Sequence, residues 1–288
     1  MDFLKEHLVS RMNKEGVTSH QLKEPVLNRI QRVGALQDYK YKQPQELIIV
    51  NLGCSWNKDD AFSFIMDHQN DIKEVHLVDA APDAINKCKE LYEKHVNPDF
   101  FKKIHFHQLA IVADPDIDTV EILFPPDDAS SGFASTNPEI VLNHYMSTTL
   151  NTREEYQQMQ KTIDEGVRPR DGIVTIIPDH LHRAKVPCTT INRFFRQCGL
   201  NAIDRLYVDL EGLDGHVLLN LDFDRFNIPF IMYEHLHLDG YRNQRKTKNS
   251  IDKQLHKKLE EYNFHIYAYG PWNAVALNEE MDISLLTP

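Results

Sequence analysis

The stretch Ile203-Asp-Arg-Leu-Tyr-Val-Asp-Leu-Glu211, which Gly212 follows, places two acids at the end of an apolar strand. Side chains alternate between the two faces of a strand, so Asp209 and Glu211 are expected on the same side. A second apolar strand, Ile228–Glu234, also ends in an acid. In an open α/β sheet ligands bind at the carboxyl ends of the strands, so these acids indicate a site. For either strand alone, the alternative is an acid that caps a helix or begins a turn.

The chain on both sides of this stretch alternates between strand and helix patterns. Toward the N-terminus, Glu46-Leu-Ile-Ile-Val-Asn51 is apolar without interruption, which is typical of a parallel strand buried on both faces. Further patterns predict strands at 74–79, 103–110, 119–124, 173–177, 264–269 and 273–277, and helices at 59–68, 82–95, 190–198 and 251–262. This alternation predicts a doubly wound, Rossmann-like α/β sheet that is mostly parallel, with a terminal antiparallel strand near 273–277.

Composition and charge describe a soluble chain with one main domain. Residues 1–43 are polar with weak helical periodicity, which predicts an N-terminal helical arm before a domain at 44–288. The net charge of −11 argues against binding nucleic acid. No apolar run approaches the roughly 20 residues of a membrane span, and the N-terminus lacks the apolar core of a signal peptide. Together with four cysteines without C-x-x-C spacing, this predicts a cytoplasmic chain with reduced thiols and no structural zinc site. His76, His105 and His107 lie on strand flanks, where we expect them to pack.

The turn at Gly53 and the acid Asp79 have the layout of a nucleotide-type cofactor site. A tight turn between a strand and a helix lets backbone N–H groups approach a ligand. An acid at the end of the next strand can accept both hydrogen bonds of a ribose diol. NAD-binding folds share this layout, but Cys54, Ser55 and Trp56 stand where G-x-G-x-x-G has its further glycines. Because those glycines admit a pyrophosphate, the sequence favours a cofactor without one, such as S-adenosylmethionine, over a nicotinamide dinucleotide.

From about residue 47 to 277 the chain resembles the FkbM family of S-adenosylmethionine-dependent methyltransferases. The block Val186-Pro-Cys-Thr-Thr-Ile-Asn-Arg-Phe-Phe195 precedes the acidic strand, and Asp209, Glu211 and Gly212 coincide with the D-hydrophobic-E-G of that family. Pro229-Phe-Ile-Met-Tyr-Glu234 is similar to its next block. The chain departs from the family pattern at four positions. Asn51 replaces an acid, Asn57 a glycine and Asn192 an aspartate, and Tyr207 replaces a lysine.

The resemblance implies methyl transfer to a hydroxyl of a sugar, glycan or other small molecule. The residues expected to hold the cofactor are Asn51, Gly53, Cys54, Ser55, Asp79, Ala80, Leu109 and Ala110. Loops at 125–150 and 239–250 are expected to shape the acceptor pocket. Because of the departures in the cofactor loop, a catalytically degenerate binding protein with the same fold is the alternative.

Methyl transfer to a hydroxyl needs a base, or a metal that lowers the pKa of the hydroxyl. Asp209, Glu211, Glu234 and His235 are the candidate catalytic residues, with His180 as a second candidate histidine. Three carboxylates at one sheet edge would repel one another, and Mg²⁺ bound by oxygen ligands would relieve that repulsion. The same three acids are therefore the candidate ligands of Mg²⁺.

Overall fold

The structure is a computed structural model, and it describes residues 46–55, 58–81, 83–124, 134–137, 140–141, 182–239, 250–270 and 272–278. Several predictions fall on other residues. The N-terminal arm at 1–43, the strand at 173–177 and His180 lie outside the described residues, as do most of the loops at 125–150 and 239–250.

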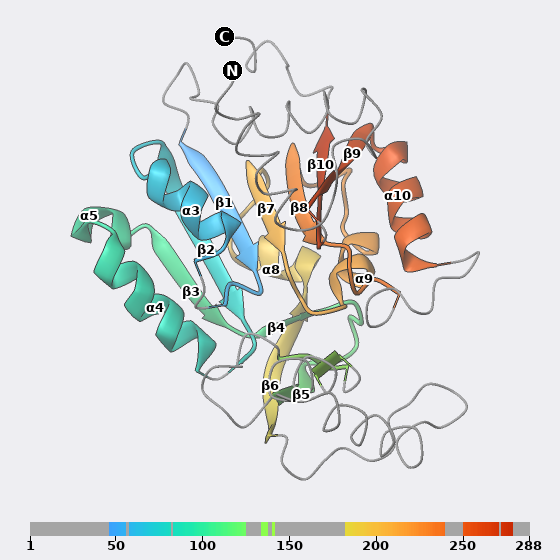
Figure 1. The fold of residues 1–288 in the computed structure, drawn as a ribbon, viewed down its shortest axis with the longest axis horizontal. Helices are drawn as coiled ribbons and strands as arrows, with labels where there is room; N and C mark the ends of the chain where they lie inside the picture. Colours follow the sequence, from blue (N-terminus) through green and yellow to red (C-terminus); the bar gives the residue numbers. More distant parts are fainter. Residues whose placement is uncertain are drawn as a thin grey trace, which may run out of the picture.

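A large sheet of seven strands is the centre of the molecule (Figure 1). Its order is β3-β2-β1-β7-β8-β10-β9. The strands are β1 (Leu47–Leu52), β2 (Ile72–Asp79), β3 (Ile104–Gln108), β7 (Arg205–Val208), β8 (Phe230–Glu234), β9 (Phe264–Tyr269) and β10 (Asn273–Asn278). The first five in this order pair in parallel, whereas β10 runs antiparallel to both of its neighbours. The predicted, mostly parallel sheet with an antiparallel strand near 273–277 is confirmed.

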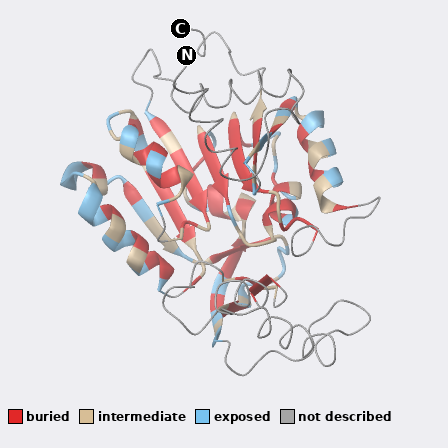
Figure 2. Ribbon diagram, in the orientation of Figure 1, coloured by how far each residue is buried: buried red, intermediate tan, exposed pale blue. Residues whose placement is uncertain are grey.

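Helices cover both faces of this sheet, as a doubly wound fold requires. The elements α3 (Asp60–Asp67) and α4 (Ala84–His95) pack on one face, and α8 (Ile191–Gln197), α9 (Asp214–Leu219) and α10 (Ile251–Glu261) pack on the other. Ile49 of β1 belongs to the first core and its neighbour Val50 to the second, which explains why this strand is apolar without interruption. Figure 2 shows the central strands mostly buried, between helices that have exposed residues. A short helix, α5 (Pro98–Phe101), precedes β3. No described helix is long and apolar enough to cross a membrane.

A second, three-stranded sheet lies beyond the carboxyl ends of β1 and β2 (Figure 1). Its order is β4-β6-β5, with β4 (Ala110–Val112), β5 (Thr119–Phe124) and β6 (His182–Thr190). The single strand predicted at 103–110 is therefore wrong: Leu109 divides it into β3 and β4, which belong to different sheets. The sequence also gave no indication of β6, which carries charged residues and Pro187. Pro187 is tolerated because pairing with β5 ends there and pairing with β4 starts at the next residue.

Candidate functional site

The strand order of the large sheet reverses between β1 and β7, and ligands of open α/β sheets bind at such a point. The loops that leave these two strands touch at Gly53 and Asp209. Asp209 N–H donates to Leu52 O at 2.8 Å, and Gly53 N–H donates to Val78 O at 2.8 Å. Gly53 has a φ of 82°, and a Cβ at this position would lie 1.7 Å from the carbonyl oxygen of Asp209. Only glycine therefore allows the two loops to meet.

Asp79, at the end of β2, organises the Gly53 loop. Its carboxylate accepts hydrogen bonds from Ser55 N–H at 3.2 Å and from Ala81 N–H at 2.8 Å. The first of these bonds holds Ser55 at a φ of 23°. Burial raises the pKa of Asp79 to about 6, so at neutral pH the group is mostly ionised. The backbone N–H of Ala80 also stabilises this carboxylate. Because a carboxylate has about four lone-pair positions, at least one is left for a ligand.

Asn51 and Cys54, two of the predicted cofactor residues, do not line the pocket that these loops form. Asn51 is buried, and its side-chain amide donates to Asp59 Oδ2 at 3.2 Å. Asp59 is the N-cap of α3 and accepts from Phe62 N–H at 2.6 Å. Cys54 is buried beside Cys88, and this burial raises the pKa of its thiol. Both predicted residues therefore stabilise the loop through buried contacts on the side away from the pocket.

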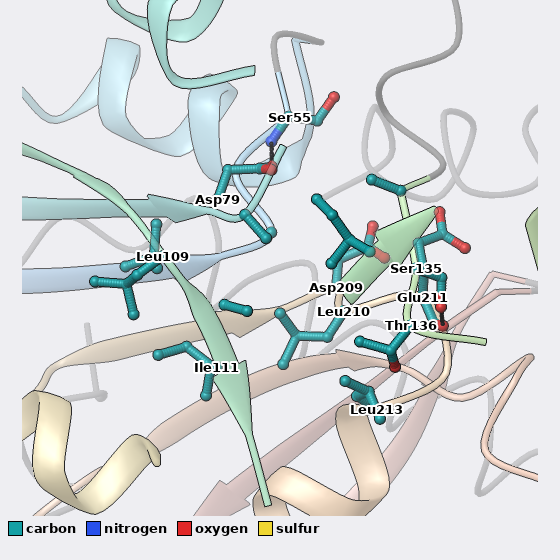
Figure 3. Close-up of a pocket in the computed structure, with 16 residues that line it drawn as sticks. Ser55, Asp79, Leu109, Ile111, Ser135, Thr136, Asp209, Leu210, Glu211 and Leu213 are labelled. Atoms are coloured by element: carbon teal, nitrogen blue, oxygen red, sulfur yellow. Dashed lines mark hydrogen bonds between the residues drawn. The ribbon is translucent and has the colours of Figure 1, made fainter. Parts of the chain in front are cut away.

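A pocket that is open to solvent lies at the switch point, between the large and the small sheet. Its lining includes six of the predicted cofactor residues, two of the predicted acids and eight further residues. The lining residues are Gly53, Ser55, Val78, Asp79, Ala80, Leu109, Ala110, Ile111, Ile122, Ala134, Ser135, Thr136, Asp209, Leu210, Glu211 and Leu213. Figure 3 shows Ser55 and Asp79 on one side of it, with Asp209, Glu211 and Ser135 on the other. Ser135 and Thr136 belong to the loop at 125–150 that was expected to shape the acceptor pocket, although the sequence did not single out these two residues.

Asp209 and Glu211 follow β7 and face this pocket. Restricted hydration in the recess raises the pKa of Asp209 to about 8, and the negative charge of Glu234 adds to the rise. Burial, then Asp209 and Asp79, raises the pKa of Glu211. Glu211 has a φ of 50°, and its carbonyl oxygen accepts a hydrogen bond from Ser135 Oγ at 2.9 Å. The loop after β5 thus holds the backbone of Glu211 through this hydrogen bond and helps to orient its side chain.

A second layer of polar groups lies behind these two acids. Glu234 Oε1, at the end of β8, is 2.9 Å from His237 Nδ1, and Glu211 Oε2 is 3.9 Å from the same nitrogen. Neither Glu234 nor His237 lines the pocket, and His237 is 1% exposed. His235, the predicted catalytic histidine, is outside the lining as well, and its backbone N–H donates to Trp272 O at 2.8 Å. Sequence reasoning did not single out His237, although its spacing of three residues from Glu234 was visible.

Asp214, which was not predicted as a site residue, adds a fully buried carboxyl to this layer. It accepts from Leu210 N–H through both oxygens at 3.3 Å. Burial, then Glu234 and Asp209, raises its pKa. Between the unfolded pKa of about 4 and the higher folded pKa, the folded state keeps a proton that the unfolded state has lost. Asp214 therefore lowers the free energy of unfolding progressively as the pH rises above about 4 toward the higher folded pKa.

We accordingly expect Asp214→Asn to raise the melting temperature relative to the wild type more at pH 8 than at pH 5. The amide keeps one acceptor for Leu210 N–H and cannot ionise. Asp99→Asn is the control, because the hydrogen bond and charge of Lys102 lower the pKa of this exposed acid. Asp99 is almost fully ionised in both the folded and the unfolded state at pH 5 and at pH 8, so the effect of this substitution on the melting temperature should not change between the two pH values. Melting curves at both pH values measure the effect. A difference between Asp214→Asn and wild type that does not change with pH would contradict the assignment.

The described lining carries three carboxyls, those of Asp79, Asp209 and Glu211, and no lysine, arginine or histidine. Asp79 is mostly ionised at neutral pH, and a cationic ligand would also favour the ionised forms of Asp209 and Glu211, whose pKa values are raised in its absence. The lining therefore favours a cationic ligand and disfavours phosphates, which bind where positive charge or exposed N–H groups outweigh the acids. Apolar side chains make up much of the remaining wall, as in pockets that hold a flat ring.

Comparison with known proteins gives one clear match. The model of the family described as Methyltransferase FkbM domain matches residues 54–266. No curated protein matches the chain. Among solved structures, a methyltransferase from Geobacter sulfurreducens is similar at 8% sequence identity and a TM-score of 0.36, covering 89% of this chain and 91% of that chain.

Proposed function

Because this chain belongs to the FkbM family of methyltransferases, we propose that it transfers a methyl group from S-adenosylmethionine to a hydroxyl of a sugar, glycan or other small molecule. The observation that carries the proposal is the acid-lined pocket at the switch point of the sheet. S-Adenosylmethionine is a sulfonium cation without phosphates, so three carboxyls and no basic side chain in the described lining suit it. The pyrophosphate of a nicotinamide dinucleotide would meet repulsion there.

In this proposal Asp79 binds the ribose diol through the lone-pair positions that its backbone donors leave open. Gly53 and Ser55 bring backbone close to the ligand, while Ala80, Leu109 and Ala110 enclose the adenine ring. Asn51 and Cys54 contribute through the shape of the loop. The bound cofactor would supply an electrophilic methyl group on a positively charged sulfur. Asp209 and Glu211, as neighbouring acids, would complement that charge.

The chemistry assigned to the chain is positioning and proton removal. Asp209 and Glu211 line the pocket, so either can reach an acceptor hydroxyl there. A carboxyl whose pKa is near neutral is a stronger base than an ordinary carboxylate. Asp209 or Glu211, as a carboxylate, would take the hydroxyl proton as the acceptor oxygen displaces sulfur from the methyl carbon. The charges of Glu234 and His237 tune the pKa of Asp209. His235 is a candidate base only for an acceptor that extends beyond the described lining.

Magnesium has no part in the proposed mechanism. Among the predicted acids, those whose ligand atoms come within 4.8 Å of one another are Glu211 and Glu234, together with His237. One of the three donors is therefore an imidazole nitrogen. Mg²⁺ binds oxygen ligands in near-octahedral geometry. The 2.9 Å contact between His237 and Glu234 also offsets part of the repulsion for which Mg²⁺ was predicted.

The departures from the family pattern are compatible with an active site. Asn51 supports the N-cap of α3, and Asn192 bonds the backbone that follows α9 through both atoms of its amide. Tyr207 is buried in the core, with its ring 5.7 Å from that of Phe230. None of these three side chains lines the pocket, and Asn57 lies outside the described residues. The alternative, a degenerate binding protein, is an outcome of the following experiment.

We expect S-adenosylmethionine to bind the wild-type chain in isothermal titration, and Asp79→Asn to weaken this binding at least tenfold. Hydrogen bonds to a charged group are worth about 1.5–3 kcal/mol each, and about 1.4 kcal/mol corresponds to tenfold. The matched control is Asp83→Asn, which removes an exposed acid four residues away and should leave the dissociation constant unchanged. An unchanged constant in Asp79→Asn would contradict the ribose assignment. A wild-type chain without affinity for the cofactor would favour the degenerate alternative.

A further inference from the structure

Three histidines that we expected only to pack form a cluster outside the methyltransferase pocket. His76 lies on β2, and His105 and His107 lie on the neighbouring strand β3, with His76 opposite His105 in the register. The ring of His76 stacks on both others, at centroid distances of 4.8 Å and 5.3 Å. All three side chains lie on the face that α8 covers, where the edge of the Phe194 ring contacts His76 and His107. Glu74 and Cys198 complete the cluster.

We propose that His76, His107 and Cys198 bind a zinc ion or a similar transition metal, with Glu74 orienting His76. The three ligand atoms lie within 4.8 Å of one another. His76 Nδ1 and His107 Nε2 are 3.1 Å apart. Two nitrogens at about 2.05 Å from a tetrahedral zinc ion stand about 3.3 Å apart. The separation of the two imidazole nitrogens is thus within a few tenths of an ångström of the required one, and the Cys198 thiol lies within 4.8 Å of both histidine ligand atoms.

Glu74 supports this assignment because its carboxylate lies beside the ring nitrogen of His76 that would not bind the metal. The second ring nitrogen of His76, Nε2, has no hydrogen bond among the described residues and lies 3.9 Å from Glu74 Oε2. A metal-bound histidine usually donates its other N–H to a carboxylate or a carbonyl, which fixes the tautomer. A proton on Nε2 toward Glu74 leaves the lone pair of Nδ1 directed at His107, where the ion would lie.

The charges of the cluster also suit a divalent ion. His76 is 4% exposed, and burial favours the neutral imidazole, which is the form that binds a metal ion. Zinc would deprotonate the Cys198 thiol, and its two positive charges would then balance one thiolate and the Glu74 carboxylate. Two nitrogens and one sulfur favour Zn²⁺ or Co²⁺ over Mg²⁺ and Ca²⁺. His107 and Cys198 are partly exposed, so water can fill the fourth position.

The rival interpretation is a simple hydrogen bond between two neutral imidazoles, and metal titration separates the two. The untagged full-length chain is stripped with a chelator and titrated with Zn²⁺ against a chromophoric competitor, and separately with Co²⁺. We expect one tightly bound Zn²⁺ per chain and, with Co²⁺, a charge-transfer absorption from the thiolate. A cobalt-loaded wild type without this absorption would overturn the proposal.

Variants then assign the ligands. Cys198→Ser and His107→Ala should each weaken Zn²⁺ binding at least about 100-fold, more than the loss of an outer partner, and Cys198→Ser should remove the charge-transfer absorption. Cys188→Ser, a cysteine outside the cluster, should change neither. Glu74→Gln should weaken binding about 10–100-fold and keep the absorption. Circular dichroism checks that each variant is folded.

His105→Ala tests the overlapping set of Glu74, His76 and His105, whose ligand atoms also lie within 4.8 Å of one another. Retained zinc affinity in this variant supports the site at His76, His107 and Cys198. Loss of affinity in His105→Ala but not in His107→Ala would overturn it, and so would an affinity that Cys198→Ser leaves unchanged.

Discussion

Gly53→Ala is expected to abolish measurable binding of S-adenosylmethionine and to lower the free energy of unfolding by about 3 kcal/mol. The estimate combines about 1–2 kcal/mol for an alanine in the left-handed region with about 1–3 kcal/mol for overpacking. The added Cβ would lie 1.7 Å from the carbonyl oxygen of Asp209, so the loops after β1 and β7 must separate. These two loops bring the proposed cofactor and acceptor sides of the pocket together, so their separation opens the site itself.

Gly199→Ala is the matched control for this prediction. Gly199 has a φ of 73°, and nothing lies within 4 Å of a Cβ built on it, so this variant has the backbone strain without the clash. We expect it to lower the free energy of unfolding by about 1–2 kcal/mol and to leave cofactor binding unchanged. Chemical denaturation and isothermal titration measure both quantities. Equal effects of the two substitutions would show that the contact between Gly53 and Asp209 has no special importance.

The part of the fold that sequence predicted best is the part in which burial determines residue type. β1 was expected at 46–51 and spans Leu47–Leu52, because a strand covered on both faces must be apolar at every position. β6 was not predicted because its residues 182–185 are mostly charged or polar, so they show no apolar strand pattern. Its strand conformation comes from pairing with β4 and β5, which are distant in sequence.

The candidate site divides in the same way. Acids at strand ends were visible because topology alone brings the carboxyl ends of parallel strands together, and the pairing of β7 with β8 confirms that their strands are neighbours. The position of His237 depends on how the loop after β8 turns, which periodicity does not report. The cluster around His76 depends on the register of β2 with β3 and on where α8 ends. Each histidine alone looks like a packed residue, and only tertiary structure distinguishes packing from a set of ligands.

Isosteric amides at the acids are expected to separate chemistry from stability. We predict that at least one of Asp209→Asn, Glu211→Gln and Glu234→Gln lowers turnover by about 100-fold or more, the usual contribution of a general base. The rate is that of S-adenosylhomocysteine formation with any hydroxyl acceptor that the wild-type chain methylates. The cofactor dissociation constant should change much less, because each amide preserves the shape of the pocket. Glu93→Gln, an exposed acid on α4, is the control and should leave turnover unchanged.

The rival interpretation gives these acids a structural role only, and melting temperature decides between the two. Restricted hydration in the pocket and neighbouring charge raise the pKa values of Asp209 and Glu211, so their ionisation destabilises the folded state as the pH rises. An amide at either position should therefore keep or raise the melting temperature at pH 8 while turnover falls. A structural acid predicts the reverse, a lower melting temperature with turnover retained. If all three amide variants turn over at the wild-type rate, these acids are not the base, and the proton of the acceptor must leave through a group outside the described lining.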